Sequence, residues 1–170
     1  MIEIRSVEDP ASLAAARSLV RAHMTIHSAV HDADSIERLV AALPVPYVAP
    51  RGDLWVAWEG AVALGCLALH ALAPTTAELK RMYVRPEARG RGVARRLCEH
   101  AIAAAAAWGY GTLRLGTLPS MRAAQQLYES LGFKRIAPYR GEELGETWFY
   151  ERRIECVGSI GDMSNGMPIL

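Results

Sequence analysis

The chain has 170 residues, of which 51% are hydrophobic and 22% charged, with a formal net charge of +1. This balance predicts a single soluble globular domain and gives no sign of a general nucleic-acid or membrane surface. No apolar run approaches the ~20 residues that a membrane-spanning helix needs. Three cysteines without metal-type spacing fit a reducing compartment, so we expect a cytoplasmic protein.

The first half of the chain predicts a strand, two helices and three further strands. Apolar and polar residues alternate over 2–7. Asp9 and Pro10 have the pattern of an N-cap and a first helical turn. Asp34 and Glu37 have the spacing of a capping box for the second helix. The predicted strands and their connections are 54–58, a turn at 59–60, 61–70, a connection over 71–77, and 78–84.

The second half alternates helices with short strands. Apolar residues recur on one helical face over 94–108, and Gly109 ends that helix. Another helix covers 121–131, with its N-cap at either Thr117 or Ser120. The remaining predicted strands are 112–115, 133–136 and 147–154. The resulting order, β-α-α-β-β-β-α-β-α-β-β, predicts an α/β fold with a sheet of mixed direction.

The C-terminal segment differs from the rest of the chain. Residues 156–170 show no periodicity and are rich in Gly, Ser, Asn and Asp, a composition typical of disorder. We therefore predict one domain over residues 1–155 and a tail over 156–170.

A basic loop before the helix over 94–108 is the clearest functional feature. Its sequence is Arg89-Gly90-Arg91-Gly92-Val93-Ala94. The two glycines let the backbone approach a ligand closely, and N–H groups at a helix N-terminus attract an anion. We interpret the loop as a cradle for a pyrophosphate. A Rossmann site is not favoured, because the loop follows the fourth strand and not the first, and a Walker loop would need Gly-Lys-Ser/Thr.

Two further motifs make this pattern specific. Tyr83-Val84-Arg85-Pro86 ends the fourth strand, and Leu127-Tyr128-Glu129-Ser130-Leu131-Gly132-Phe133 lies downstream. With the basic loop, they resemble the signatures of the GNAT superfamily, the GCN5-related N-acetyltransferases. Those signatures are Tyr-Val-x-Pro, Arg/Gln-x-x-Gly-x-Gly/Ala and Leu-Tyr-x-x-x-Gly-Phe. The resemblance covers about residues 2–154 and implies the GNAT fold, whose fourth and fifth strands are splayed apart.

The resemblance also implies the donor, acetyl-CoA, and its reaction, acyl transfer to an amine. The backbone of Met82 and Val84 would pair with the pantetheine arm, and the Met82 N–H would donate to the thioester carbonyl. Met121 stands where the family often has an Asn that bonds the cofactor. The cofactor-binding residues implied in this way are Met82, Tyr83, Val84, Arg89, Gly90, Arg91, Gly92, Val93, Ala94 and Met121.

Two side chains are predicted to move protons. Only a neutral amine attacks a thioester, and the departing thiolate benefits from an acid. Tyr128 matches the acid of the family; the alternative is a ring that packs on the core. Glu78 is the predicted base, directly or through a water, because period-two counting places it on the face of Met82 and Val84. Some family members have a glutamate there. The alternative is an exposed carboxylate paired with Lys80 or an arginine.

The acceptor side is less sharply defined. The family builds this pocket from the first two helices, the fourth strand and the last connection, so the expected lining residues are Tyr47, Trp55, Tyr139 and Arg140. His23 and His27 are four residues apart, but no further ligand is arranged around them, so we expect no metal site and a polar helix end that faces this pocket. Lys80, Arg81 and Arg140 would attract an acidic acceptor, although a solvated face explains them equally well.

The leading functional hypothesis is an N-acetyltransferase that acts by direct attack on a small-molecule or amino-acid-like primary amine. A protein N-terminus or lysine is the alternative acceptor. A hypothesis of another class is a GNAT-fold module that binds acyl-CoA without turnover, because a fold does not determine function. We expect no nucleic-acid or membrane partner, and GNAT proteins often form homodimers.

Overall fold

The structure is a computed structural model that describes residues 1–26, 32–141 and 146–155. Within these residues, a seven-stranded sheet has the order β1-β2-β3-β4-β5-β7-β6. The strands are β1 (Ile2–Ser6), β2 (Asp53–Glu59), β3 (Val62–Ala73), β4 (Thr76–Val84), β5 (Thr112–Thr117), β6 (Lys134–Ile136) and β7 (Trp148–Arg153). The helices are α1 (Pro10–Ile26), α2 (Ala33–Ala42), a short 3₁₀ helix η1 (Pro86–Ala88), α3 (Val93–Ala107) and α4 (Arg122–Ser130). The predicted order of elements and the mixed α/β sheet are confirmed.

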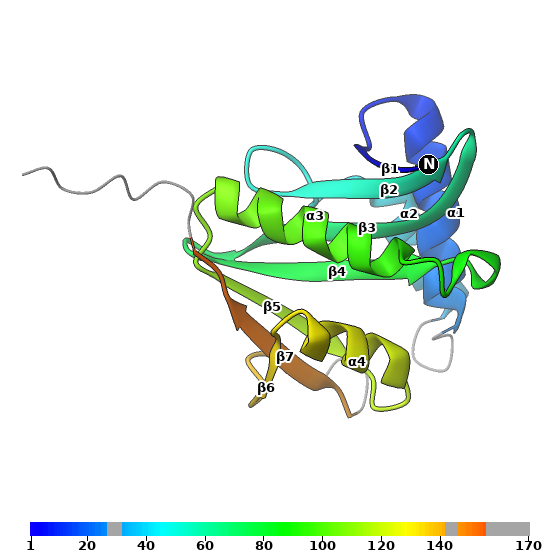
Figure 1. Ribbon diagram of the computed structural model, residues 1–170. Helices are drawn as coiled ribbons and strands as arrows, with labels where there is room; N and C mark the ends of the chain where they lie inside the picture. The colour runs from blue at the N-terminus through cyan, green and yellow to red at the C-terminus, as the bar shows by residue number, and fades with distance from the viewer. Residues whose placement is uncertain (27–31, 142–145, 156–170) are drawn as a thin grey trace, which may run out of the picture.

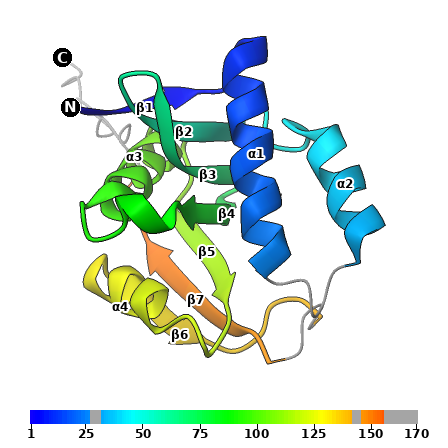
Figure 2. The same ribbon diagram turned by 90° about the vertical axis from the view of Figure 1, so that its right-hand side faces the viewer.

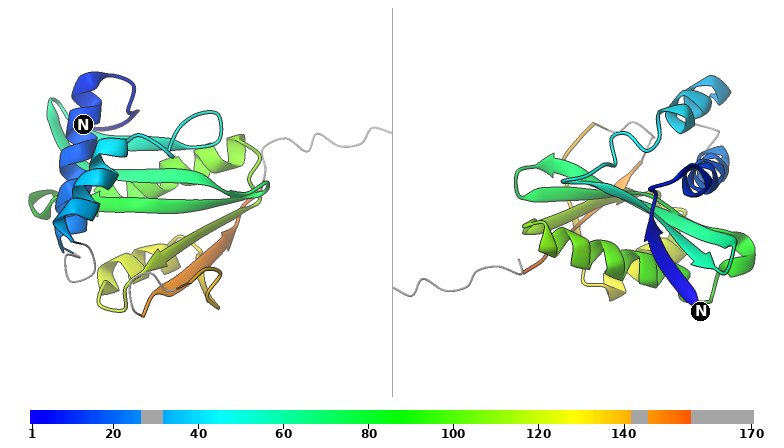
Figure 3. Two further views of the ribbon diagram at one scale, coloured as in Figure 1. Left: turned by 180° about the vertical axis from the view of Figure 1, so that it is seen from behind. Right: turned by 90° about the horizontal axis from the view of Figure 1, so that it is seen from above.

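Helices cover both faces of the sheet (Figures 1 and 2). The α1 and α2 helices lie on one face and α3 on the other, as the view from above shows (Figure 3). Buried residues such as Leu19, Val40 and Leu54 fill the layer under α1 and α2. A second buried cluster, which includes Leu97 and Leu113, fills the layer under α3. Each cluster therefore fixes its helices against one face of the sheet.

The β4 and β5 strands pair only where they begin. They are parallel, and their pairing runs from Thr76–Thr112 to Glu78–Arg114. Beyond that point the two strands diverge, as the wedge between them in Figure 1 shows. The splayed strands expected from the family resemblance are thus present. From Leu79 onward, the edge of β4 that faces β5 is open to another partner.

A β-bulge interrupts β4 close to its end. Between Cys66 and Ala68, a single residue of β3 stands opposite two residues of β4, Arg81 and Met82. Arg81 has a φ of 58°, in the left-handed region that is uncommon for residues other than glycine. The extra residue reverses the alternation of side chains beyond it, because neighbouring residues of a strand point to opposite faces.

The start of the second helix differs from its prediction. Asp32 is the N-cap, and its Oδ1 accepts the N–H of Ser35 at 2.8 Å. The helix begins at Ala33, so Asp34 lies inside the first turn and the capping box predicted with Glu37 is wrong. The spacing alone was ambiguous, because aspartates stand at both 32 and 34.

Other boundaries shift by a few residues. The first hairpin turns at 60–61, where Gly60 has a φ of 58°, one residue later than predicted. The predicted connection over 71–77 is mostly strand, because β3 and β4 continue to a turn at 74–75. The N-cap of α4 is Met121, which is neither of the two predicted residues. The predicted cap at Asp9 is confirmed by bonds from the N–H groups of Ala11 and Ser12.

The predicted tail over 156–170 lies outside the described residues. Within 1–26, 32–141 and 146–155, no helix combines the length and the apolar character that crossing a membrane requires.

Candidate active site

A groove follows the open edge of β4 to the N-terminus of α3, with α4 as its other wall. We call it the splay groove, and its volume is about 860 Å³. It brings together three segments that carry the sequence motifs: the end of β4, the basic loop and α4. The predicted cofactor-binding residues that line it are Met82, Tyr83, Val84, Arg89, Gly90, Gly92, Val93, Ala94 and Met121.

The basic loop has the geometry of an anion cradle. Gly90 and Gly92 have φ values of 73° and 78°, which L side chains rarely adopt. A Cβ added to either glycine would meet no atom within 4 Å, so both glycines border open space. The N–H of Arg96 bonds to the carbonyl of Gly92 at 3.1 Å. The N–H groups of the helical residues before Arg96 have no acceptor within the helix, and the helix dipole favours an anion there.

Arg91 is the predicted cofactor residue that does not line the splay groove. Its Nη2 atom lies 2.6 Å from Glu59 Oε1, and both side chains are exposed. The Arg91 main chain remains part of the loop, whereas its charge is directed to β2. The Arg89 side chain borders the groove and donates to the carbonyl of Val84 at 3.2 Å.

The bulge at Arg81 separates Glu78 from the residues expected on its face. Met82 and Val84 pack against the same cluster as Leu79, on the α3 side of the sheet. Glu78 precedes Leu79 and therefore points to the opposite face, toward α1 and α2. The period-two argument that placed Glu78 with Met82 and Val84 is wrong, because it assumed a regular strand.

Glu78 is almost completely buried, with 1% of its surface exposed. Its Oε1 accepts a bond of 2.7 Å from the hydroxyl of Tyr139 and lies 3.2 Å from Arg140 Nη2. Its Oε2 lies 2.9 Å from His70 Nε2 and 3.8 Å from Lys80 Nζ. Two strands and the connection between β6 and β7 therefore converge on one carboxylate.

The surroundings of Glu78 favour its ionised form. Burial by itself would raise the pKa of this carboxyl. The hydrogen bond with His70 and the nearby positive charges outweigh burial, so the pKa of Glu78 lies below its ordinary value. Glu78 therefore holds a negative charge at neutral pH, and its lowered pKa makes it a weak base.

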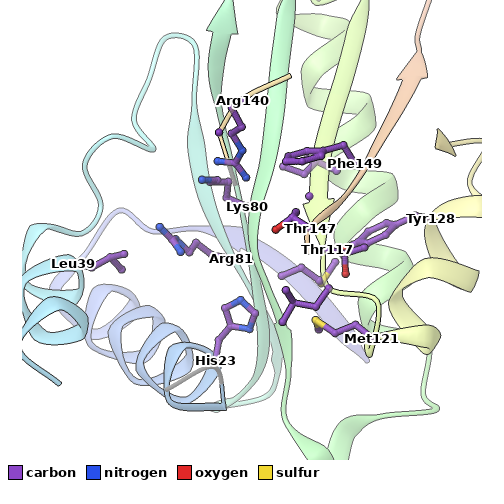
Figure 4. A pocket seen from close by; sticks show the side chains of 15 residues that line it. His23, Leu39, Lys80, Arg81, Thr117, Met121, Tyr128, Arg140, Thr147 and Phe149 are labelled. Atoms are coloured by element: carbon purple, nitrogen blue, oxygen red, sulfur yellow. The ribbon is translucent and has the colours of Figure 1, made fainter. Parts of the chain in front are cut away.

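Tyr128 lies where α4 faces the diverging strands. Its ring is buried and makes an edge contact with Phe133, with ring centroids 5.9 Å apart. Burial raises the pKa of Tyr128 well above its ordinary value, so the phenol keeps its proton at neutral pH. Figure 4 shows the hydroxyl pointing toward the cavity described next.

A second cavity lies on the α1–α2 side of the diverging strands. We call it the inner cavity, and its volume is about 270 Å³. His23 of α1 and Leu39 of α2 form one wall, and Arg140 and Thr147 of the β6–β7 connection form the other (Figure 4). The inner cavity and the splay groove share four lining residues: His23, Met82, Met121 and Tyr128. The two spaces therefore meet beside the Tyr128 hydroxyl.

Of the residues expected to line the acceptor pocket, some line the inner cavity and others do not. Arg140 and His23 line the inner cavity as predicted. Trp55 does not, because it faces the α3 side, where it stacks on Trp108. Tyr47 is buried behind the cavity, and its hydroxyl accepts a bond of 3.0 Å from Arg81 Nε. Tyr139 also lies behind the cavity, bonded to Glu78.

His70 is the main residue that sequence reasoning missed. It stands directly opposite Glu78 in the β3–β4 hairpin. A correct hairpin register would have indicated this pairing, because opposite residues share a face. His27 lies outside the described residues. Within the part of the chain that is described, no group of three His, Cys, Asp or Glu side chains is arranged to hold a metal.

Comparisons with known proteins agree with this geometry. The acetyltransferase (GNAT) domain model matches residues 50–135, half of the chain. An uncharacterized N-acetyltransferase of Schizosaccharomyces pombe is 41% identical over 95 residues, 55% of this chain and 58% of that protein. The N-acetylaspartate synthetase of Danio rerio is 36% identical over 99 residues, 57% of this chain and 35% of that protein. The chain thus spans less than two thirds of the length of either relative.

The fold has counterparts among solved structures. The structure of Salmonella typhimurium yncA with its cofactor acetyl-CoA matches with a TM-score of 0.70 and 24% identity, over 89% of this chain and 93% of that one. The splayed strands, the glycine loop and the family model lead to the same conclusion. The chain belongs to the GNAT acetyltransferase family.

Proposed function

We propose that the chain is an N-acetyltransferase that moves the acetyl group of acetyl-CoA to the primary amine of a small, amino-acid-like acceptor. The observation that carries the proposal is the junction of the splay groove with the inner cavity at Met82, Met121 and Tyr128. A transferase needs separate sites for donor and acceptor that open onto one reacting point. The family membership and the named relatives support the same reaction class.

The splay groove fits coenzyme A. The N–H groups at the start of α3 face the groove beside Gly90 and Gly92 and would hold the pyrophosphate. The β4 edge beyond Glu78 has no pairing with β5, so the main chain of Met82 and Val84 can pair with the pantetheine amides. Acetyl-CoA supplies an activated thioester at the junction.

The chain contributes two hydrogen-bond donors to the reaction. The amine nitrogen forms a bond to the acetyl carbon, and the bond from that carbon to sulfur breaks. The Met82 N–H donates to the carbonyl oxygen as negative charge develops on it. The nitrogen loses a proton to water as the amide forms, and the Tyr128 hydroxyl gives its proton to the departing thiolate. The tyrosinate then regains a proton from water. Burial keeps this phenol protonated beforehand.

The base remains a prediction. Glu78 was expected to take the ammonium proton, but its carboxylate lies beneath Lys80 and Arg140 and does not line either space. A proton would reach it only through water. The cavity volume of about 270 Å³ favours a small acceptor over a protein chain.

A panel of amines tests the proposal. CoA release from acetyl-CoA would be followed with a thiol-reactive dye for amino acids, polyamines and peptides with a free N-terminus. Calorimetry would measure CoA binding in parallel. We expect CoA binding and turnover with amino acids. Tight CoA binding without turnover of any amine would contradict the proposal and identify a binding module. Turnover of peptides alone would move the acceptor to proteins.

A further inference from the structure

The inner cavity is strongly cationic. Lys80, Arg81 and Arg140 all line it, and none of its described lining residues is Asp or Glu. The buried carboxylate of Glu78 contacts Lys80 and Arg140 but is not among the groups that line the cavity. A neutral or cationic acceptor would gain nothing from this arrangement, whereas an acceptor with carboxylates would be attracted to it.

The three cations have different surroundings. The Arg81 guanidinium contacts Tyr47 and Met24 on the α1–α2 side, and both of these partners are uncharged. Lys80 and Arg140 both contact the buried carboxylate of Glu78. In the view of Figure 4, Arg81 lies below Lys80 and Arg140. One carboxylate thus contacts two of the three cations that line the cavity.

Arg140 is held in place on several sides. Its guanidinium carbon lies 5.8 Å from the ring centre of Tyr139 and 5.7 Å from that of Phe149. Its Nη2 contacts Glu78 at 3.2 Å and would lie 3.3 Å from a Cβ added at Gly116. The guanidinium has five N–H donors in a planar fork. The contact with Glu78 uses one nitrogen of the fork, and a rigid fork of this kind recognises carboxylates.

We propose that Lys80 and Arg140, positioned by Glu78, bind a carboxylate of the acceptor, and that the acceptor is an amino acid with two carboxylates. The inference rests on the proposed function and names the substrate class of its acceptor site. Arg81 provides the second cationic point in the same cavity.

Glu78 is then a positioning residue. Its carboxylate keeps two like charges close together, where they would otherwise repel each other. This role differs measurably from that of a general base. Loss of a base lowers kcat and removes one limb of the pH profile. Loss of a positioning carboxylate raises the KM of the acidic acceptor and leaves the shape of the pH profile intact.

Matched amino acids provide the test. Aspartate and asparagine, and glutamate and glutamine, differ by one charge at nearly constant size. We expect wild-type kcat/KM to favour the acid over its amide by at least about tenfold, the worth of one charged hydrogen bond. Arg140→Gln should raise the KM for aspartate about 10- to 100-fold and affect asparagine far less. Arg153→Gln, an exposed arginine at the end of β7, is the matched control and should behave as wild type.

Two further variants test the placement of Arg140 and the role of Glu78. Gly116→Ala places a Cβ 3.0 Å from Thr147 Cγ2 and 3.3 Å from Arg140 Nη2, so it should raise the KM for aspartate without removing a charge. Glu78→Gln should also raise the KM for aspartate, while kcat and the shape of the pH profile stay as in wild type. A large loss of kcat in Glu78→Gln with an unchanged KM would overturn the positioning role and restore the base.

The inference of an acidic acceptor can be disproved without disproving the proposed acetyltransferase activity. Equal kcat/KM for aspartate and asparagine, with turnover of both, would overturn this inference and leave the proposed function standing. Loss of turnover with every amine tested, in a protein that binds CoA, would overturn both. The thermal unfolding midpoint of each variant confirms that it is folded.

Discussion

The splay groove and the inner cavity meet at one point but are built in different ways. The groove is formed mainly by one continuous run of chain, from Met82 to Ala94, together with α4. The anion site proposed for it consists of main-chain N–H groups at a helix N-terminus. The inner cavity collects side chains from α1, α2, β4, β5 and the β6–β7 connection.

Under the proposed function, this difference would separate recognition of the donor from recognition of the acceptor. A cradle of main-chain groups depends on backbone conformation, so most side-chain changes leave it intact. A cavity lined by side chains changes its preference when one residue changes, because charge and shape are local there. We therefore expect changes of loop conformation to weaken acetyl-CoA binding and changes of cavity charge to alter the choice of amine.

The largest expected effect lies at the junction. Tyr128→Phe removes the proton donor and keeps the ring, so kcat should fall about 100-fold or more, with little change in the KM for acetyl-CoA. Tyr150→Phe is the matched control, since Tyr150 is buried but lines neither space. A wild-type rate in Tyr128→Phe would remove the acid from the mechanism.

A pair of glycine variants tests the groove. Gly92→Ala and Gly60→Ala both place a side chain at positive φ without a steric contact, so each should lower the free energy of unfolding by about 1–2 kcal/mol. Gly92→Ala should also raise the KM for acetyl-CoA about 10- to 100-fold, the worth of one to two charge-assisted hydrogen bonds to phosphate. Gly60 lies in the β2–β3 turn, so its variant should keep the wild-type KM. Equal values of KM in the two variants would contradict a main-chain cradle.

The pH dependence of stability tests the charge of Glu78. Its pKa in the folded state lies below the ordinary value of about 4.3, so its stabilising charge is present above that pH and is lost as the pH falls through the folded pKa. The groups that face it are His70, Lys80, Tyr139 and Arg140. The unfolding midpoint of wild type should exceed that of Glu78→Gln at pH 7, and the gap should narrow as the pH falls below the ordinary pKa of the carboxyl and through its lower folded-state pKa. A constant gap would mean that ionisation of Glu78 does not stabilise the fold.

The smallest effect is expected at Arg91. Its side chain pairs with Glu59 at the surface and does not line the groove. Arg91→Gln should therefore change the KM for acetyl-CoA by no more than about fivefold, the range of an exposed charge. A loss as large as that of Gly92→Ala would show that the arginine charge, and not the main chain, holds the pyrophosphate.

The sequence predicts the groove far better than the cavity. The order of elements and the glycine loop follow from local patterns, because turns, caps and periodicity are encoded within a few residues. The face of Met82 could not be predicted, since the bulge at Arg81 has no glycine to mark it. The contacts of Glu78 could not be predicted from local sequence either. Tyr139 is 61 residues away in the chain, and the contact of Glu78 with His70 depends on the hairpin register.

A structure of the protein with CoA and aspartate bound would test the central claim most directly. We predict that the CoA sulfur lies within hydrogen-bonding distance of the Tyr128 hydroxyl, with the pyrophosphate on the N–H groups that follow Gly90. We also predict an aspartate carboxylate on the Arg140 guanidinium, with the amine directed to the junction. A sulfur atom far from Tyr128, or aspartate bound outside the inner cavity, would contradict that claim.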